Sequence, residues 1–144
     1  MSSTIDLPDL NVWLALASPD HIHHPQAGDY WENLAADQVV FCSVTALGLV
    51  RLISQPKLMG NAVKSPSEAA MLLQDFFKQP GVSLATPVCD GWDVFHQLMQ
   101  GRHGPARHCT DVYLAALAIS NGWRLVSFDR DFERFTDLQR LALA

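Results

Sequence analysis

The sequence has few charged residues and no excess of basic ones. Charged side chains make up 17% of its 144 residues, and the formal net charge is -5 at pH 7. Disordered chains carry more charge, and nucleic-acid binders that work by bulk charge are basic, so both classes are disfavoured. A nucleic-acid partner would have to be held by a local basic patch or through a bound cation.

Cysteine is also scarce, and long apolar runs are missing. The three cysteines, Cys42, Cys89 and Cys109, lie far apart and form no CxxC pair. This spacing predicts reduced thiols in a cytoplasmic protein rather than a disulfide framework. No apolar stretch is long enough to span a bilayer, and polar residues interrupt the N-terminus. We therefore expect no membrane association and no signal peptide.

Apolar residues, in contrast, make up 49% of the chain, which is enough for a sizeable core. At this length we expect one domain that covers residues 1–144. Apolar segments of strand type alternate along the chain with segments of helical periodicity. The alternation predicts an α/β fold in three layers, with a central, mostly parallel sheet and helices on both faces.

The same patterns place the individual elements. We expect strands at 5–7, 39–42, 82–85 and 125–128, and a further strand is possible within 135–143. We expect helices at 12–17, 25–36, 46–53, 69–77, 90–100 and 111–120. Pro8 is placed at the end of the first strand, because proline has no amide hydrogen for a central ladder. Trp31 and Leu34 are expected to face inward, and Asn121-Gly122 to stop the last helix with a left-handed cap.

Several acidic residues fall at expected strand ends or helix starts. Asp9 ends the first strand, Asp129 and Asp131 follow the strand at 125–128, and Asp111 opens the helix before it. If those strands are neighbours, the acids meet at the sheet edge where ligand sites of open α/β sheets gather. Carboxylates that close repel one another, and a hard divalent cation is the simplest compensation. Such an ion polarises phosphate oxygens and activates water, which points to phosphodiester hydrolysis.

Each acid taken singly has a simpler interpretation. An aspartate at a strand end or a helix start is commonly a cap or a turn former. This applies to Asp9 and Asp111, and most of all to Asp131, which precedes a short helical pattern. The hypothesis of a shared site therefore depends on the ordered set of acids and on no single one.

Four segments together resemble the PIN-domain family. Asp9–Leu16 is similar to the opening motif of PIN domains, Thr110–Ala118 to their third acidic motif and Leu125–Phe132 to their final one, with Ser43–Leu52 between them. The resemblance covers nearly the whole chain and is strongest to VapC-type toxins of bacterial toxin–antitoxin pairs. It implies a PIN-like fold and a Mg²⁺- or Mn²⁺-dependent endoribonuclease that hydrolyses RNA with metal-activated water. It also implies inhibition by a VapB-like antitoxin, and a homodimer.

The resemblance assigns the catalytic residues one by one. Asp9, Asp111 and Asp129 match the metal-binding acids of the family motifs. Asp131 matches a frequent companion acid in the final motif. Asn11 is the polar residue that accompanies the first acid. These five residues are the expected catalytic set, and the first three are the expected metal ligands.

One position departs from the family pattern. PIN domains commonly carry a Glu early in the helix after the second strand, and Gly48 stands there in this chain, as in a Gly-x-x-Arg variant of some VapC-like sequences. The missing carboxylate leaves open a degenerate PIN domain that binds RNA or a protein partner without cleaving. A phosphatase with Asp9 as nucleophile is a third and weaker alternative, because no DxD motif follows the first strand.

Cationic and polar residues near the acids are the candidates for RNA contact. Arg102 and Arg107 lie in the loop before the third acidic motif, and Arg51 lies one helix turn beyond Gly48, where it could contact phosphate or pair with one of the acids. We expect a loop arginine to bind RNA phosphate, since arginine can offer phosphate two parallel hydrogen bonds. Thr110 is expected to orient an acid or a water molecule. A solvated surface loop is the alternative interpretation.

Overall fold

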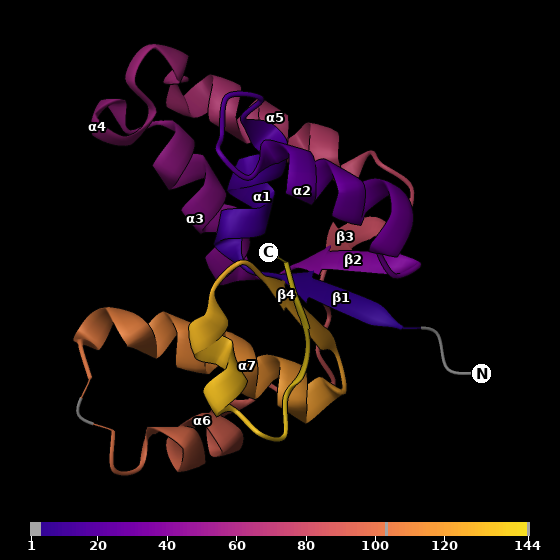
Figure 1. Ribbon diagram of the computed structural model, residues 1–144, viewed down its shortest axis with the longest axis vertical. Coiled ribbons are helices and arrows are strands. Elements are labelled where there is room, and N and C mark those ends of the chain that lie inside the picture. The colour runs from indigo at the N-terminus through magenta and orange to yellow at the C-terminus, as the bar shows by residue number, and fades with distance from the viewer. Residues whose placement is uncertain (1–3, 103, 144) are drawn as a thin grey trace.

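The computed structural model describes residues 4–102 and 104–143, and its centre is a parallel β-sheet (Figure 1). Within these residues the strands are β1 (Ile5–Pro8), β2 (Gln38–Phe41), β3 (Val82–Leu84), β4 (Arg124–Ser127) and β5 (Gln139–Ala142). Their order in the sheet is β3-β2-β1-β4-β5, and every pairing is parallel. The predicted parallel sheet is confirmed, and β1 and β4, whose ends precede acids, are direct neighbours.

Helices cover both faces of this sheet, which confirms the three-layer prediction (Figure 1). One layer contains α1 (Leu10–Ala17), α2 (His24–Asp29), α3 (Ser43–Ile53), α4 (Pro56–Met59) and α5 (Pro66–Phe77); the other contains α6 (Trp92–Met99) and α7 (Cys109–Asn121). Shorter helical turns are η1 (Tyr30–Leu34), η2 (Gly60–Ala62), η3 (Ala106–His108) and η4 (Arg130–Arg134). Across residues 4–102 and 104–143, none of the helices has the length and apolarity that a bilayer crossing requires.

Apolar side chains are buried on both faces of the strands. Leu7 and Leu125, from the adjacent strands β1 and β4, pack toward α7. On the opposite face, the Trp13 ring of α1 stacks on Phe41 of β2 with 3.8 Å between ring centroids. All four side chains are completely buried. This double burial explains why the strands read as short continuous apolar runs, and it holds the strand ends rigidly in place.

Helix α7 connects two of the acidic positions. It begins just before Asp111 and ends at Gly122, whose φ of 68° lies in the left-handed region that favours glycine. The predicted stop at Asn121-Gly122 is therefore confirmed. Only Trp123 separates this cap from β4, so α7 lies directly against the strand that leads to Asp129.

The segment after Pro25 differs from the prediction. Its α-helix ends at Asp29 and continues as η1, a π-helical turn that ends at Leu34. Leu34 is 47% exposed, so its predicted inward orientation is wrong, and Tyr30 is completely buried instead. The wider turn changes which side chains face the sheet, and Tyr30 gains a hydrogen bond from its hydroxyl to buried Asp6 at 2.6 Å.

Candidate active site

The acids of the sequence motifs meet where β1 and β4 end. Asp9 follows β1 directly, Asp129 is the second residue after β4, and Asp111 lies in the first turn of α7. The backbone amide of Asp9 donates to the carbonyl of Val126 at 2.7 Å, which ties the two strand ends together. Asp111 and Asp129 both influence the pKa of Asp9, so the three carboxyl groups lie within electrostatic reach of one another.

Asp9 is held in one orientation by hydrogen bonds to both of its oxygens. Its Oδ1 accepts from the amide of Leu10 at 2.7 Å and so caps α1, while its Oδ2 accepts from the Ser127 hydroxyl at 2.9 Å. The residue is only 8% exposed. Asp9 can therefore cap α1 and belong to the acidic site at the same time, because Oδ1 makes the cap and Oδ2 faces Ser127.

Ser127, the last residue of β4, is the site residue that the sequence interpretation missed. Its buried hydroxyl donates to Asp9 and accepts from the amide of Asp129 at 2.9 Å and from Asn11 Nδ2 at 3.4 Å. One side chain therefore positions the acids of two strands. The signal available in the sequence was a small hydroxyl residue two positions before Asp129, inside the final acidic motif.

Asp131 lies at the edge of the cluster. It is exposed, and its amide donates to Asp129 Oδ1 at 2.9 Å, so Asp129 caps the turn η4, which contains Asp131. Its carboxylate still raises the pKa of Asp111 by repulsion. Asp131 therefore adds negative charge to the cluster and helps to orient Asp129 through the backbone.

The environment of Asp9 disfavours its charged form. Burial is the main cause, and repulsion from Asp111 and Asp129 adds to it, so the pKa of Asp9 is raised from 3.8 to about 6. Hydrogen bonds from Ser127 and Leu10 oppose this rise without cancelling it. A buried carboxylate held close to other acids is a common feature of functional sites, and a bound cation would relieve its cost.

Asp111 is subject to opposing influences. Burial and then repulsion from Asp129 raise its pKa, while His108 and Arg134 act in the opposite direction. The acidic cluster is therefore bordered by positive or titratable groups on the α7 side. His108 belongs to the loop that the sequence places beside the acids, whereas Arg134 was not expected there.

Replacing Asp9 with asparagine is expected to stabilise the metal-free chain at neutral pH by about 2 kcal/mol. The raised pKa means that between pH 3.8 and about 6 Asp9 is mainly protonated in the folded chain and mainly ionised in the unfolded chain. The destabilisation caused by Asp9 is absent below this pH range, grows as pH rises through it, and is complete above it. Thermal unfolding in EDTA should show a gain of roughly 4–8 °C at about pH 7.5 that vanishes toward about pH 4.

The exposed acid Asp75 of α5 offers a matched control, since Asp75→Asn makes the same change far from the cluster. It should leave the midpoint nearly unchanged. An Asp9→Asn variant that melts below the native chain at neutral pH in EDTA would show that the acids do not repel one another as described.

The donor set fits a hard cation. All candidate ligands are oxygens, which Mg²⁺ and Mn²⁺ prefer. Within the described residues, the buried Oδ1 of Asn11 has no hydrogen-bond partner, and it lies beside the network of Ser127. The same residues bring no three His, Cys, Asp or Glu side chains close enough to hold an ion by themselves. The donor types therefore suit a hard cation, and the acidic side chains of the described residues do not by themselves form a complete ligand set.

The departure at Gly48 has a packing explanation. Gly48 is buried in α3, and a Cβ at this position would lie 2.7 Å from Cδ2 of Leu10, the first residue of α1. A glutamate at this position therefore requires the Leu10 side chain to turn away. The three nearest atoms all belong to that flexible side chain, so the contact makes an acid less favourable here without excluding it.

The residues predicted to contact RNA are not all brought to the acids. Arg51, Arg107 and Thr110 are exposed, and among the described residues neither arginine influences the pKa of Asp9 or Asp111. Within residues 4–102 and 104–143, no hydrogen bond or ion pair involves the side chains of these three. Arg102 is half-buried beside a pocket near α7. Of the four, Arg102 has the most defined surroundings.

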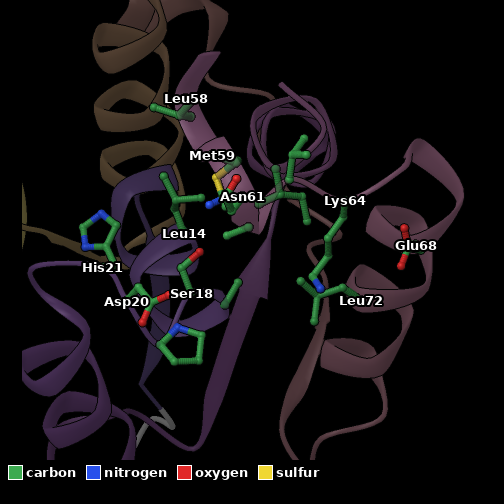
Figure 2. A pocket seen from close by; sticks show the side chains of 15 residues that line it. Leu14, Ser18, Asp20, His21, Leu58, Met59, Asn61, Lys64, Glu68 and Leu72 are labelled. Atoms are coloured by element: carbon green, nitrogen blue, oxygen red, sulfur yellow. The ribbon is translucent and has the colours of Figure 1, made fainter. Parts of the chain in front are cut away.

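A cavity of about 440 Å³ lies apart from the acids, between the end of α1 and the helices α3 to α5. Figure 2 shows Leu14, Leu58 and Leu72 along its wall, with Ser18 and Lys64 among its few polar groups. None of the expected catalytic residues lines it. The acids therefore do not lie in this cavity.

Comparisons with known proteins agree with this geometry. A family model described as PIN domain matches residues 7–138. The chain is 32% identical to Ribonuclease VapC41 of Mycobacterium tuberculosis over an alignment of 144 residues, covering 96% of this chain and 98% of that protein. The solved structure of VapBC-1 from nontypeable Haemophilus influenzae matches with a TM-score of 0.68 at 18% identity, covering 96% of this chain and 98% of that chain. VapC20 of Mycobacterium tuberculosis, a sarcin-ricin loop cleaving toxin, matches with a TM-score of 0.66 at 16% identity, covering 90% and 93%.

Proposed function

The chain belongs to the PIN-domain family and, within it, to the VapC ribonucleases, and from this premise we propose that it is a divalent-metal-dependent endoribonuclease, the toxin of a toxin–antitoxin pair. The observation that carries the proposal is the meeting of Asp9, Asp111 and Asp129 at the ends of β1 and β4. Repulsion from Asp111 and Asp129 raises the pKa of Asp9, so a cation at this place would be stabilising.

We propose Mg²⁺ or Mn²⁺ as the cofactor, with Asp9, Asp111 and Asp129 as the residues that would hold it. When bound, such an ion lowers the pKa of water and offsets the charge of the phosphodiester. Ser127 and Asn11 keep the acids aligned, so little reorganisation accompanies substrate binding. Asp131 supports this arrangement through its backbone hydrogen bond to Asp129.

The proposal extends to substrate and partners. We infer that the substrate is RNA and that a VapB-like antitoxin binds the chain, as the names of the related ribonuclease and of the VapBC structure suggest. We further propose a homodimer that acts in the cytoplasm, each subunit being a single domain of residues 1–144. Because the chain has a net charge of -5, RNA would have to be held by local cations and by the bound ion.

One observation favours a second candidate function. Gly48 replaces a common acid of the family, and Leu10 occupies the space beside it. A site with one carboxylate fewer binds a cation more weakly, so a degenerate domain that binds RNA or a protein partner without cleavage is the alternative. The two functions differ in their affinity for a divalent cation, so metal binding and RNA cleavage measured together distinguish them.

The purified chain is expected to cut single-stranded RNA with Mg²⁺ or Mn²⁺ and to stop when EDTA is added. Calorimetric titration with Mn²⁺ should show binding, and Asp129→Asn should weaken it by about tenfold or more because a negative ligand is lost. Asp75→Asn serves as the control for charge. Cutting that persists in EDTA would rule out the metal-dependent mechanism, and a chain that binds no Mn²⁺ and cuts no RNA would favour the degenerate domain.

A further inference from the structure

A pocket of about 330 Å³ lies between the end of α6, the loop that follows it and the start of α7. Two arginines from distant segments line it: Arg102 follows α6, and Arg134 ends η4. His108 lines the same pocket. Among the described residues, no aspartate or glutamate contributes to its wall. The pocket is therefore basic in a chain that is acidic as a whole.

Both arginines pack on one aromatic ring. The guanidinium carbons of Arg102 and Arg134 lie 4.8 Å and 4.9 Å from the ring centroid of Phe135, which is buried. Arg102 is held further by a hydrogen bond from its Nε to the carbonyl of Leu98 at the end of α6. Phe135 thus contacts two cationic groups from distant segments, as arginine stacking on aromatic faces allows.

Neither arginine has a direct counter-ion among the described residues. Within residues 4–102 and 104–143, neither forms an ion pair with a carboxylate, although the charge of Arg134 acts on Asp111. Burial and the neighbouring Arg134 both lower the pKa of Arg102, which indicates that the two cations repel each other. An anion that enters the pocket would be stabilised by both charges. A phosphate group suits these donors, because a guanidinium offers it several N–H groups.

The pocket also borders the acidic cluster. Arg134 and His108 are the groups whose charge favours the ionised form of Asp111. Cys109 and Val112, which flank Asp111 on α7, line the pocket as well. An anion in the pocket would therefore lie within electrostatic reach of the acids without occupying the acidic cluster itself.

We propose that Arg102 and Arg134, held on Phe135, form a subsite for an RNA phosphate next to the bond that is cleaved. The inference rests on the proposed nuclease function and assigns binding of the RNA backbone to Arg102 and Arg134. Arg102 also closes the end of α6, but Arg134 is exposed and has no comparable structural contact among the described residues. Arg134 is therefore the better residue for a test.

Arg134→Gln is expected to raise the KM for an RNA oligomer by about tenfold, a larger effect than on kcat, and to lower the salt dependence of binding by about one charge. Lys78→Gln removes the same charge from the exposed end of α5 and should change neither quantity. Arg102→Lys keeps the charge but loses the planar pair of donors, so it should fall between the native chain and Arg134→Gln. Circular dichroism melting checks that every variant is folded.

A second measurement locates the phosphate. RNA oligomers that each carry one neutral methylphosphonate linkage are compared as substrates for the native chain and for Arg134→Gln. At one position near the cleaved bond, neutralisation should weaken the native reaction by about tenfold and leave the Arg134→Gln reaction unaffected, because the interaction is already lost.

The results separate this inference from the proposed function. If the native chain cuts RNA but Arg134→Gln behaves like Lys78→Gln, or if neutral linkages affect both proteins equally, the subsite is wrong and the nuclease stands. If the native chain cuts no RNA with Mg²⁺ or Mn²⁺, the nuclease fails, and fluorescence anisotropy with labelled RNA tests the subsite alone. Weaker RNA binding by Arg134→Gln than by Lys78→Gln would then support it, and equal binding would overturn it.

Discussion

Asp9→Asn is expected to slow metal-dependent RNA cleavage by about a hundredfold to a thousandfold. Asp9 is the acid that the structure fixes most firmly, with one oxygen on the amide of Leu10 and the other on the hydroxyl of Ser127. Asparagine can keep the helix cap, since it caps helices about as well as aspartate. It removes the negative charge that a cation would need at the end of β1, and its single amide oxygen can accept only one of the two hydrogen bonds made to Asp9.

The measurement is a single-turnover cleavage rate at saturating Mn²⁺, with Asp75→Asn as the matched control. Because Asp9→Asn should be more stable than the native chain without metal, a lost rate cannot be attributed to unfolding. A variant that retains more than about a tenth of the native rate would remove Asp9 from the proposed mechanism.

Asp6→Ala is expected to destabilise the fold by about 3–5 kcal/mol, a larger effect on stability than that of Asp9→Asn and opposite in sign. Asp6 is completely buried in the central strand β1, three residues before Asp9. Its carboxylate accepts from Arg124 Nε at 2.8 Å and Nη2 at 2.9 Å, from the Tyr30 hydroxyl at 2.6 Å and from the amide of Ala36 at 3.0 Å. Its removal leaves one cation and two other donors without their acceptor.

Urea denaturation followed by circular dichroism gives the free energy of unfolding for this comparison. Asp75→Ala is the control, because it breaks only an exposed contact with Lys78 at 3.9 Å and should cost little. Tyr30→Phe removes a single donor to Asp6 and should cost about 1–2 kcal/mol. A loss of less than about 1 kcal/mol for Asp6→Ala would mean that the buried pair contributes no more than its desolvation costs.

Local patterns in the sequence were sufficient for the elements that carry the acids. Pro8 could only end a strand in a parallel sheet, so Asp9 had to lie at a strand end. Gly122 had to end a helix, and the apolar run after it had to be a strand, which placed Asp129 at the next strand end. The positions of the catalytic acids along the chain were therefore predictable, and so was the family motif that contains them.

The tertiary structure decided which of these groups meet. Asp9 and Ser127 are 118 residues apart, and their hydrogen bond exists because β1 and β4 pair in the sheet. The same pairing joins Asp6 to Arg124, an ion pair that no local pattern indicates. Arg134 likewise reaches the pocket of Arg102 only because both side chains pack on Phe135.

By itself, then, the sequence determined which segments form the strands of the sheet and the main helices, and which acids follow them, because those features depend on side-chain periodicity and caps within a few residues. Strand order, the orientation of Tyr30 in place of Leu34, and the partners of each charge depend on packing between segments far apart in the chain. Such contacts are chosen by shape and burial in three dimensions, and a linear pattern carries little information about them.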